Sequence, residues 1–447
     1  MFEGQQEEVL QFGFDPEVPA ARHRLFGEHQ RQGIGGELMG RAAETVPRIL
    51  IQQDQQGQGG LGGLDPVVAF APGGRQVQIL AARPKLGVEG LKATTSDAVM
   101  KGTMTDILAN PLPVFHDRDC DLSIIRGKRV AMIGYGSQGR THALNLRDSG
   151  VTDIVVGLKP GSKTRAVAEA DGFKVMTAGE AAAGADVVAV MTSDEAHRDL
   201  WRDELAPAVR PGAALIFAHG LSVRFGLVEP RDDLDVILAS PKGIGPRIRD
   251  LYEAGEGVFC LFGVHQDATG GAHALGLSYT AALGCGRKGI LETTMRDECE
   301  SDLFGEQVVL CGGIAELIDS AFMKLVEAGY PAEVAWFECF YEAKLVTDLM
   351  YERGIAGAFA KISNTAEYGA YRTGPRVIGA ESRAAMDQVL AEVQGGGFVR
   401  DLMADYDAGS PDLMARRAAL GRRPIESVGA RLNEAARRAR ETAANDD

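Results

Sequence analysis

The sequence predicts an α/β fold in which a doubly wound parallel sheet is followed by an all-helical domain. Short apolar runs alternate with Ala-rich helical segments from Arg129 to about Thr294, which is typical of parallel βαβ units. The first of these runs ends in a glycine-rich turn that opens a helix. After about Thr294 the short runs stop, and long helical patterns continue towards the C-terminus.

Bulk properties exclude several classes of function. The chain has 447 residues, of which 45% are hydrophobic and 24% charged, as is usual for a soluble globular protein. A formal net charge of −15 disfavours a nucleic-acid partner, because phosphate backbones are bound by clustered Lys and Arg. No run approaches the roughly 18 apolar residues of a membrane span. The six cysteines lack Cys-x-x-Cys spacing and are typical of reduced thiols, so we expect a cytoplasmic protein.

The first part of the chain differs from the rest. Residues 1–103 contain the low-complexity stretch "QQDQQGQGGLGG" and show no clear apolar period. We predict a leader that is disordered or translated from a start upstream of Met104; a regulatory or targeting extension is the alternative. The α/β domain is then predicted over 104–294 and the helical domain over 295–440, with a tail at 441–447.

The predicted strands follow one another at intervals that leave room for helices. After "RVAMIG" at Arg129 comes the helical segment "SQGRTHALNLRDSG". The later strands are expected at "DIVVGL", "DVVAVMTS", "AALIFAHG", "DVILAS" and "GVFCLFGV", and long helices at "FGEQVVLCGGIAELIDSAFMKLVEAG" and "PAEVAWFECFYEAKLVTDLMYERG".

A glycine motif predicts a nucleotide site at the end of the first strand. "GYGSQG" sets Gly134, Gly136 and Gly139 in Gly-x-Gly-x-x-Gly spacing between a strand and a helix. The first glycine permits a tight turn, the second lets a pyrophosphate approach the backbone, and the third lets helix and strand pack closely. The helix N-terminus offers free N–H groups to phosphates. The pattern indicates a Rossmann-type dinucleotide-binding domain; the alternative is a purely structural turn.

The segment after the second strand favours NADP over NAD. An NAD site usually has an acidic residue here, which holds the ribose hydroxyls. In this chain the strand "DIVVGL" is followed by Lys159, Ser162, Lys163 and Thr164, and cations with hydroxyls suit a 2′-phosphate. The alternative is that both lysines are solvated surface residues.

Two pairs of carboxylates in the helical part predict a metal site. Asp302 and Glu306 are four residues apart, as are Glu338 and Glu342, and both pairs have apolar or aromatic neighbours. Residues at this spacing share one face of a helix, where like charges repel. Oxygen ligands suit Mg²⁺, and two ions can share bridging carboxylates. The alternative is two amphipathic helices whose acids face solvent.

Beyond the leader the chain closely resembles ketol-acid reductoisomerase (acetohydroxy-acid isomeroreductase) of the short, class I type. The resemblance runs from about Val114 to about Arg437. It is carried, in the same order, by the strings "VFHDRDCDLSIIRGKRVAMIGYGSQG", "FAHG", "DECESDLFGEQVVLCGG", "FECFYEAKLVTDLMYERGI" and "ISNTAEYG".

The resemblance implies roles for the matching residues. It implies that NADPH is held by Tyr135, Gly136, Ser137 and Gln138 in the glycine loop, by Lys159, Ser162 and Thr164 at the 2′-phosphate, and by Asp194, Glu195, Ala196, His197 and Gly245. It implies that His219 and Lys242 are catalytic, although His219 alone reads as a packed or capping residue. It further implies that Asp302, Glu306, Glu338 and Glu342 bind two Mg²⁺, that Glu342 could shuttle protons, and that Ser363 contacts the substrate.

The family's reaction and assembly follow as expectations. The resemblance implies a Mg²⁺-dependent alkyl migration in 2-acetolactate or 2-aceto-2-hydroxybutyrate, followed by NADPH reduction to a 2,3-dihydroxy acid, in valine and isoleucine biosynthesis. The helical domain of the family is knotted, and in its short class two subunits interlock. Glu338, Glu342 and Ser363 would therefore come from the partner chain of a homodimer or larger homo-oligomer. The rival functions are a metal-free NADP-dependent hydroxy-acid dehydrogenase and a non-catalytic NADP-binding paralogue.

Three segments depart from the family pattern, all of them around the cofactor. The stretch 243–246 reads Gly-Ile-Gly-Pro where the family often has Gly-Pro-Gly-His. The stretch 193–197 reads Ser-Asp-Glu-Ala-His in place of a segment like Pro-Asp-Glu-Phe-Gln, and Arg140 and Thr141 replace a common His-Ala. These changes bear on cofactor affinity and substrate range rather than on the class of reaction.

Overall fold

The computed structural model describes residues 67–70, 76–79 and 111–445, and the chain divides into two units, 1–100 and 101–447. In the first unit, β1 (Val67–Phe70) and β2 (Gln76–Ile79) pair as an antiparallel hairpin. The rest of the predicted leader, the alternative start at Met104 and the last two residues of the predicted tail lie outside the described residues.

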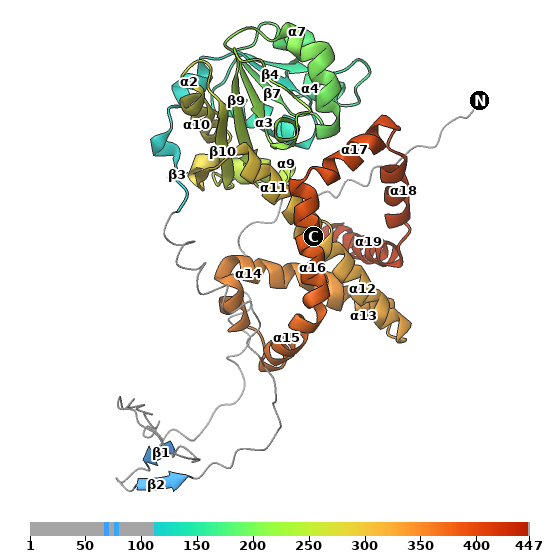
Figure 1. Cartoon of the computed structure of the whole chain (residues 1–447). Coiled ribbons are helices and arrows are strands. Elements are labelled where there is room, and N and C mark those ends of the chain that lie inside the picture. The colour runs from blue at the N-terminus through green and yellow to red at the C-terminus, as the bar shows by residue number, and fades with distance from the viewer. Residues whose placement is uncertain (1–66, 71–75, 80–110, 446–447) are drawn as a thin grey trace, which may run out of the picture. The chain divides into compact units, whose positions relative to one another are not determined.

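Within 111–445 the sheet has nine strands in the order β3-β11-β10-β9-β8-β7-β4-β5-β6 (Figure 1). Strand order reverses between β4 and β7, and in open α/β sheets ligands bind at the carboxyl ends of the strands beside such a switch point. The bounds are β3 (Val114–Phe115), β4 (Val130–Ile133), β5 (Ile154–Gly157), β6 (Lys174–Met176), β7 (Val187–Val190), β8 (Ala214–Phe217), β9 (Asp235–Pro241), β10 (Cys260–Gln266) and β11 (Ile290–Glu292).

The predicted doubly wound sheet is present, and one of its edges is mixed rather than parallel. Strands β4 to β9 pair in parallel, but β10 runs antiparallel to β9, and β11 runs antiparallel to β3. A strand buried on both faces has the same apolar pattern whichever way it runs. Its direction depends on the connection before it, so "GVFCLFGV" could be predicted as a strand but not as a reversed one.

Alternation along the strands divides the buried side chains between two cores. Val130 and Met132 of β4 enter one core, and Ala131 and Ile133 enter the other. Helices α2, α3, α4 and α10 contribute to the first core, and α5 with the π-helical turn η4 to the second. The bounds are α2 (Leu122–Arg126), α3 (Ser137–Asp148), α4 (Arg165–Ala170), α5 (Ala178–Ala182), α6 (His197–Leu200), η4 (Trp201–Leu205), α7 (Ala206–Ala208), α8 (Leu221–Arg224), α9 (Gly245–Glu253) and α10 (Ala272–Ala282), with the 3₁₀ turns η2 (Asp117–Asp119), η3 (Asp194–Ala196) and η5 (Cys285–Arg287).

A buried histidine between α3 and α10 makes the stability of this domain sensitive to acid. His142 is fully buried, with Nδ1 3.0 Å from the hydroxyl of Tyr279, and burial lowers the pKa of His142 to about 3. In the unfolded chain the imidazole titrates near pH 6.5. Its contribution to stability is therefore complete above pH 6.5 and is lost as the pH falls from there towards 3.

We expect His142→Gln to flatten the pH dependence of unfolding. Between pH 7.5 and pH 5 the wild type should lose about 2 kcal/mol more unfolding free energy than the variant, because only the wild type has a histidine at position 142 to protonate on unfolding. Urea unfolding at both pH values measures the difference. His265→Gln, which replaces an exposed histidine, is the control, and wild-type pH dependence in His142→Gln would contradict the expectation.

Every described element after β11 is a helix (Figure 1). Two single π-helical turns interrupt the long helices predicted from the sequence. The bounds are α11 (Met295–Gly305), the π turn η6 (Glu306–Leu310), α12 (Gly313–Glu327), α13 (Ala332–Trp336), the π turn η7 (Phe337–Tyr341), α14 (Glu342–Phe359), α15 (Asn364–Val377), α16 (Ala380–Gln394), α17 (Gly397–Asp407), α18 (Pro411–Leu420) and α19 (Pro424–Asn445). In the described part of the chain, none of these helices is long and apolar enough to cross a membrane.

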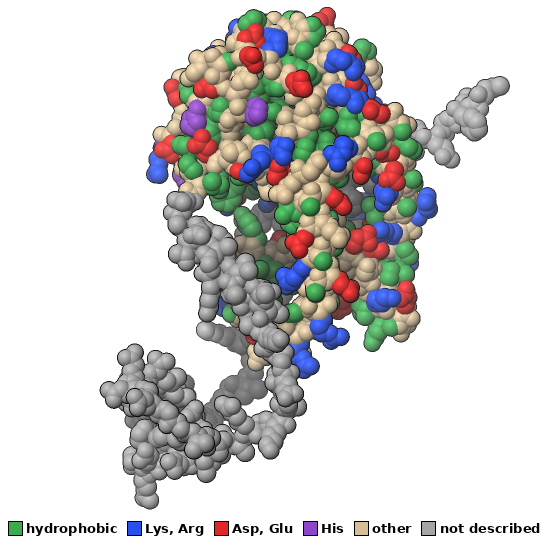
Figure 2. All heavy atoms as spheres, in the orientation of Figure 1, with side chains coloured by type: hydrophobic (Ala, Val, Ile, Leu, Met, Phe, Trp, Pro, Cys, Tyr) green, Lys and Arg blue, Asp and Glu red, His purple; other side chains and the backbone are tan. Residues whose placement is uncertain are grey.

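Helices α14 and α15, in the middle of the helical region, bury few of their side chains within one chain. Helix α14 has 18 residues and buries Ala358 alone, while α15 buries none of its 14. On the face that Figure 2 displays, charged side chains of both signs are interspersed with apolar ones over the sheet domain and the helical region. The large exposed side chains on η7 and α14 are Phe337, Phe340, Tyr341, Leu345, Val346, Tyr351 and Ile355.

Candidate active site

Three elements bring charged side chains together at the carboxyl edge of the sheet. His219 follows β8, Lys242 follows β9, and Glu298 and Asp302 lie one turn apart on α11. Helix α11 starts at a Thr294 cap, whose side chain accepts from the amide of Asp297. The close approach of α11 to the β8 loop requires a glycine, since a Cβ at Gly220 would lie 2.5 Å from the Met295 carbonyl oxygen.

Glu298 is the centre of this cluster. Its side chain is 0% exposed. Its Oε1 accepts from Lys242 Nζ at 2.7 Å and from Ser240 Oγ at 2.8 Å, and Oε2 accepts from the Gly220 amide at 2.9 Å. Burial raises the pKa of Glu298, but the hydrogen bond and charge of His219 and the charge of Lys242 outweigh it and lower the pKa to about 2. The carboxylate is therefore ionised throughout the physiological range.

Both cations of the cluster are held charged by their carboxylate neighbours. His219 Nδ1 lies 3.2 Å from Glu298 Oε2 and 3.5 Å from Asp302 Oδ2. Burial lowers the pKa of His219, but hydrogen bonds with Cys299 and Glu298 outweigh it and raise the pKa to about 11. Lys242 Nζ also donates to Asp302 Oδ1 at 2.9 Å. Burial lowers the pKa of Lys242, but the negative charges of Glu298 and Asp302 raise it by more. His219 is thus a member of the cluster and not a packed core histidine.

The predicted metal ligands fall into two groups in one chain. Among the described residues, His219, Glu298 and Asp302 form a group with ligand atoms within 4.8 Å of one another. Glu306 begins η6 one turn beyond Asp302, and burial and the negative charge of Asp302 raise the pKa of Glu306. No group of potential metal ligands among the described residues contains Glu338 or Glu342. A single chain therefore does not bring the four predicted carboxylate ligands together.

Glu338, Glu342 and Ser363 all lie on the exposed part of the helical region. Glu338 lies within η7 and Glu342 follows it directly, while Glu306 is the first residue of η6, so each carboxylate pair has one member in a π-helical turn. Single π turns inside α-helices occur frequently at functional sites. Ser363 caps α15, accepting from the Ala366 amide at 3.2 Å.

The glycine loop has the geometry of a dinucleotide cradle. Gly134 has a φ of 98°, and a Cβ there would lie 2.7 Å from the Met191 carbonyl oxygen; a Cβ at Gly139 would lie 2.3 Å from Gly134 O. At Gly136 there is open space within 4 Å of such a Cβ, which leaves room for a phosphate. Within the described residues, Thr192 Oγ1 and Gln138 Oε1 are buried without a hydrogen-bond partner, and a bound dinucleotide would supply one.

The remaining predicted cofactor residues lie around this loop. A Cβ at Gly245 would meet Ser137 O at 2.2 Å, so these two residues are packed together, and Gln138 Nε2 donates to Gly243 O at 2.9 Å. Ser162 and Thr164 lie after β5 with their hydroxyl oxygens 3.0 Å apart. Lys159 precedes them and is exposed.

The segment from Asp194 to His197 forms η3 and the start of α6. His197 is buried, with Nδ1 2.6 Å from Ser222 Oγ and Nε2 3.1 Å from Thr192 O. Both ring nitrogens of His197 therefore lie within hydrogen-bond distance of protein groups, and the buried imidazole holds the segment in place. Asp194, Glu195 and Ala196 are half-buried at its surface.

The sequence prediction omitted Glu298, Ser240 and Thr192. The signal for Glu298 was present in the spacing, since Glu298, Asp302 and Glu306 recur every four residues and share one helix face. Nothing in the sequence separates Glu298 from the acidic residues beside it, because its surroundings are supplied by Gly220, Ser240 and Lys242 at the ends of two strands distant in sequence.

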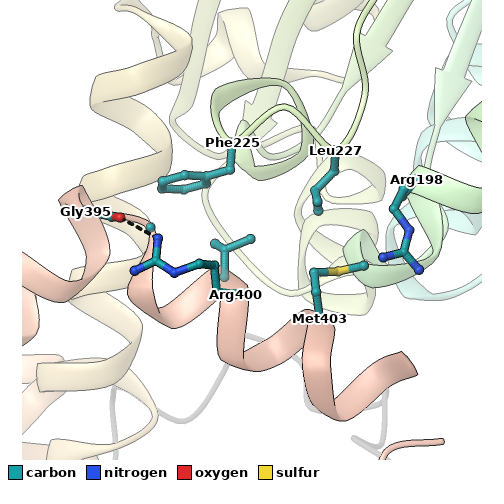
Figure 3. Close-up of a pocket in the computed structure, with 8 residues that line it drawn as sticks. Arg198, Phe225, Leu227, Gly395, Arg400 and Met403 are labelled. Atoms are coloured by element: carbon teal, nitrogen blue, oxygen red, sulfur yellow. Dashed lines mark hydrogen bonds between the residues drawn. The ribbon is translucent and has the colours of Figure 1, made fainter. Parts of the chain in front are cut away.

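A cavity of about 250 Å³ lies beside this site, between the end of α8 and helix α17. Figure 3 shows Phe225, Leu227 and Met403 in its apolar wall, with Arg198 and Arg400 at its sides. Its lining contains none of the predicted site residues.

Two family models match the chain. The model for the acetohydroxy acid isomeroreductase NADPH-binding domain matches residues 124–289, and the model for the ketol-acid reductoisomerase C-terminal domain matches residues 295–438. Among solved structures, an NADH-preferring ketol-acid reductoisomerase from an uncultured archean is 40% identical, with a TM-score of 0.70. That match covers 72% of this chain and 99% of the other.

More distant structures are also similar to this chain. A semialdehyde dehydrogenase NAD-binding protein from Cupriavidus necator is 18% identical, with a TM-score of 0.45 over 60% of this chain and 98% of the other. A 3-hydroxyisobutyrate dehydrogenase from Mycobacterium tuberculosis is 19% identical, with a TM-score of 0.37 over 68% of this chain and 99% of the other.

Proposed function

Because this chain belongs to the ketol-acid reductoisomerase family and is thus a nicotinamide-dependent oxidoreductase and isomerase, we propose the finer details of its reaction. The substrate is 2-acetolactate or 2-aceto-2-hydroxybutyrate, the cofactors are two Mg²⁺ and NADPH, and the product is a 2,3-dihydroxy acid. The observation that carries the proposal is the buried Glu298 cluster beside the dinucleotide loop. The two are directly linked, since Lys242 adjoins Gly243, whose carbonyl accepts from Gln138.

The donor set fits hard divalent cations. Asp302 and Glu306 offer carboxylate oxygens on successive turns, and Glu338 and Glu342 do the same on the second helical segment. Oxygen donors of this kind suit Mg²⁺. Four carboxylates are more than a single Mg²⁺ usually takes from a protein, whereas two ions could share them. Burial and the negative charge of Asp302 both raise the pKa of Glu306, and bound cations would offset this cost of placing two carboxylates together.

We propose that the site is completed by a second copy of the chain. Glu338, Glu342 and Ser363 are exposed and form no ligand group with Asp302 among the described residues. Glu338 and Glu342 lie among the exposed aromatic and aliphatic side chains of η7 and α14, and an exposed apolar patch of this kind marks an interaction surface. An interlocked homodimer would cover this surface and bring both carboxylate pairs into one site.

The proposed reducing cofactor is NADPH. The residues after β5 include Lys159, Ser162 and Thr164, with no acidic side chain between 158 and 165 to hold ribose hydroxyls. The 40% identical relative is described as NADH-preferring, so the family accommodates either nicotinamide. In this chain a cation and two neighbouring hydroxyls favour a 2′-phosphate. Six free cysteines support a reducing, cytoplasmic setting.

The side chains of the cluster have separable tasks. Bound Mg²⁺ would act as a Lewis acid and bound NADPH as the hydride donor. Lys242 Nζ, 2.9 Å from Asp302, is placed to donate to a substrate oxygen and to stabilise negative charge that develops there. Glu298 fixes the positions of Lys242 and His219 through its contacts with both. Glu342, which is exposed in one chain, would serve as the proton-exchanging carboxylate once a second chain brings it to this cluster.

An NADPH-oxidation assay with 2-acetolactate tests the proposal. We expect turnover with Mg²⁺, a loss of at least about 100-fold in EDTA, and recovery when Mg²⁺ is restored. We also expect kcat/KM to be about 10-fold higher with NADPH than with NADH, the worth of one charge-assisted hydrogen bond.

Each rival function predicts a different result in this assay. Full activity in EDTA would indicate a metal-free hydroxy-acid dehydrogenase. NADPH binding without turnover would indicate a non-catalytic paralogue. A preference for NADH would leave the reaction standing and remove the 2′-phosphate site.

A further inference from the structure

Asp171 joins two parts of the proposed cofactor site. The hydroxyl of Tyr135 donates to Asp171 Oδ2 at 2.8 Å. Arg140 donates to the same carboxylate twice, from Nε to Oδ2 at 2.7 Å and from Nη2 to Oδ1 at 3.1 Å. We refer to Tyr135, Arg140 and Asp171 as the Asp171 brace.

The brace connects the glycine loop with the segment after β5. Tyr135 lies between Gly134 and Gly136, and Arg140 lies in the first turn of α3. Asp171 directly follows α4, a helix that begins immediately after Thr164. One end of the brace is thus at the pyrophosphate loop, and the other is one short helix away from the proposed 2′-phosphate residues.

Helix α4 has few other attachments. It has six residues and buries only Ala168. A helix this short is not stable by itself, so its position depends on tertiary contacts. Its end is held by the Asp171 carboxylate and by Arg147, whose Nη1 donates to the Asp171 carbonyl oxygen at 2.6 Å. The polar contacts of Asp171 therefore tie the end of α4 to Arg140 and Arg147 of α3.

The brace is more than a solvated surface ion pair. The side chain of Arg140 is 51% exposed, but that of Asp171 is 18% exposed and Tyr135 is 3% exposed, with the Tyr135 ring packed edge-on against Phe173. The hydrogen bond from Arg140 is the largest of the effects that lower the pKa of Asp171. The carboxylate is therefore ionised at neutral pH. A bidentate guanidinium–carboxylate contact also has a fixed geometry, which a histidine or lysine at position 140 would not reproduce.

We propose that Arg140 and Asp171 are positioning residues for cofactor choice, which hold α4 so that Ser162 and Thr164 are ordered before a 2′-phosphate binds. This inference rests on the proposed NADPH site. A preordered loop binds its ligand without the entropic cost of ordering it. NADPH depends on this loop more than NADH does, so loss of the brace penalises NADPH selectively.

The test compares 2′,5′-ADP with 5′-AMP, which differ only in the 2′-phosphate, by titration calorimetry on the full chain. We expect Arg140→Ala to weaken 2′,5′-ADP about 10-fold and 5′-AMP less than about 2-fold, since only the former needs the ordered loop. In the assay, KM for NADPH should rise about 10-fold while kcat changes less than about 3-fold. Asp171→Asn should behave in the same way, and Arg140→Lys should be intermediate.

Arg202→Ala is the matched control, because Arg202 is an exposed arginine paired with Asp203 on η4. It should leave both affinities unchanged. Equal weakening of both nucleotides in Arg140→Ala, or no weakening of either, would overturn the role of the brace. A wild-type chain that binds both nucleotides equally would instead overturn the 2′-phosphate site itself.

Discussion

Replacing Glu298 with glutamine is expected to lower kcat by about 10³-fold and to destabilise the chain. Removing one partner of a buried ion pair leaves the other charge uncompensated, at about 3–5 kcal/mol. Here two cations, Lys242 and His219, lose their shared carboxylate at once. Glutamine keeps the shape of the side chain but directs an amide N–H towards one of these donors. Lys242 would then be misplaced relative to Asp302.

Steady-state kinetics with thermal unfolding separate the two effects. Glu300→Gln is the matched control, because Glu300 lies on the same helix and pairs with Arg224 outside the cluster. It should lower Tm without changing kcat more than about 3-fold. If Glu298→Gln also kept wild-type kcat, Glu298 would be a structural residue only, and the proposed organisation of the cluster would be wrong.

The second large effect on kcat is expected at Asp302 and Glu338, which do not belong to one ligand group within a single chain. Asp302→Asn and Glu338→Gln should each lower kcat about 10³-fold, although Asp302 lies in the charged cluster and Glu338 is exposed on η7. An exposed acid that faced solvent alone would change activity little when neutralised. Glu352→Gln, at another exposed acid on the next helix, is the control and should remain close to wild type.

The sheet domain was largely predictable because its elements follow local rules. The run "RVAMIG", which ends in Gly134, predicts a buried strand followed by a tight turn, and the structure has both. The reversed direction of β10 was not predictable, because it depends on how α9 and its loop return the chain. The π turns were missed for a similar reason, since "FECFYE" has an ordinary helical pattern.

The candidate site was only partly predictable from the residues themselves. Asp302 and Glu306 could be paired by their spacing, but the sequence gives no measure of burial. Glu298 therefore looked like Asp297 and Glu300, which are respectively exposed and paired with Arg224. His219 was proposed through the family resemblance, and the structure adds the reason: the β8 loop packs on α11 through Gly220, which places the imidazole at Glu298 and Asp302.

The central claim is that each active site combines Asp302 of one chain with Glu338 of another, and mixing two inactive variants tests it most directly. In a heterodimer of Asp302→Asn and Glu338→Gln chains, one site carries both changes and the other carries none. Random mixing of equal amounts, after co-expression or refolding together, should therefore restore about a quarter of wild-type activity. If each site were built within one chain, every site in the mixture would carry one change, and the mixture would remain as inactive as its parts.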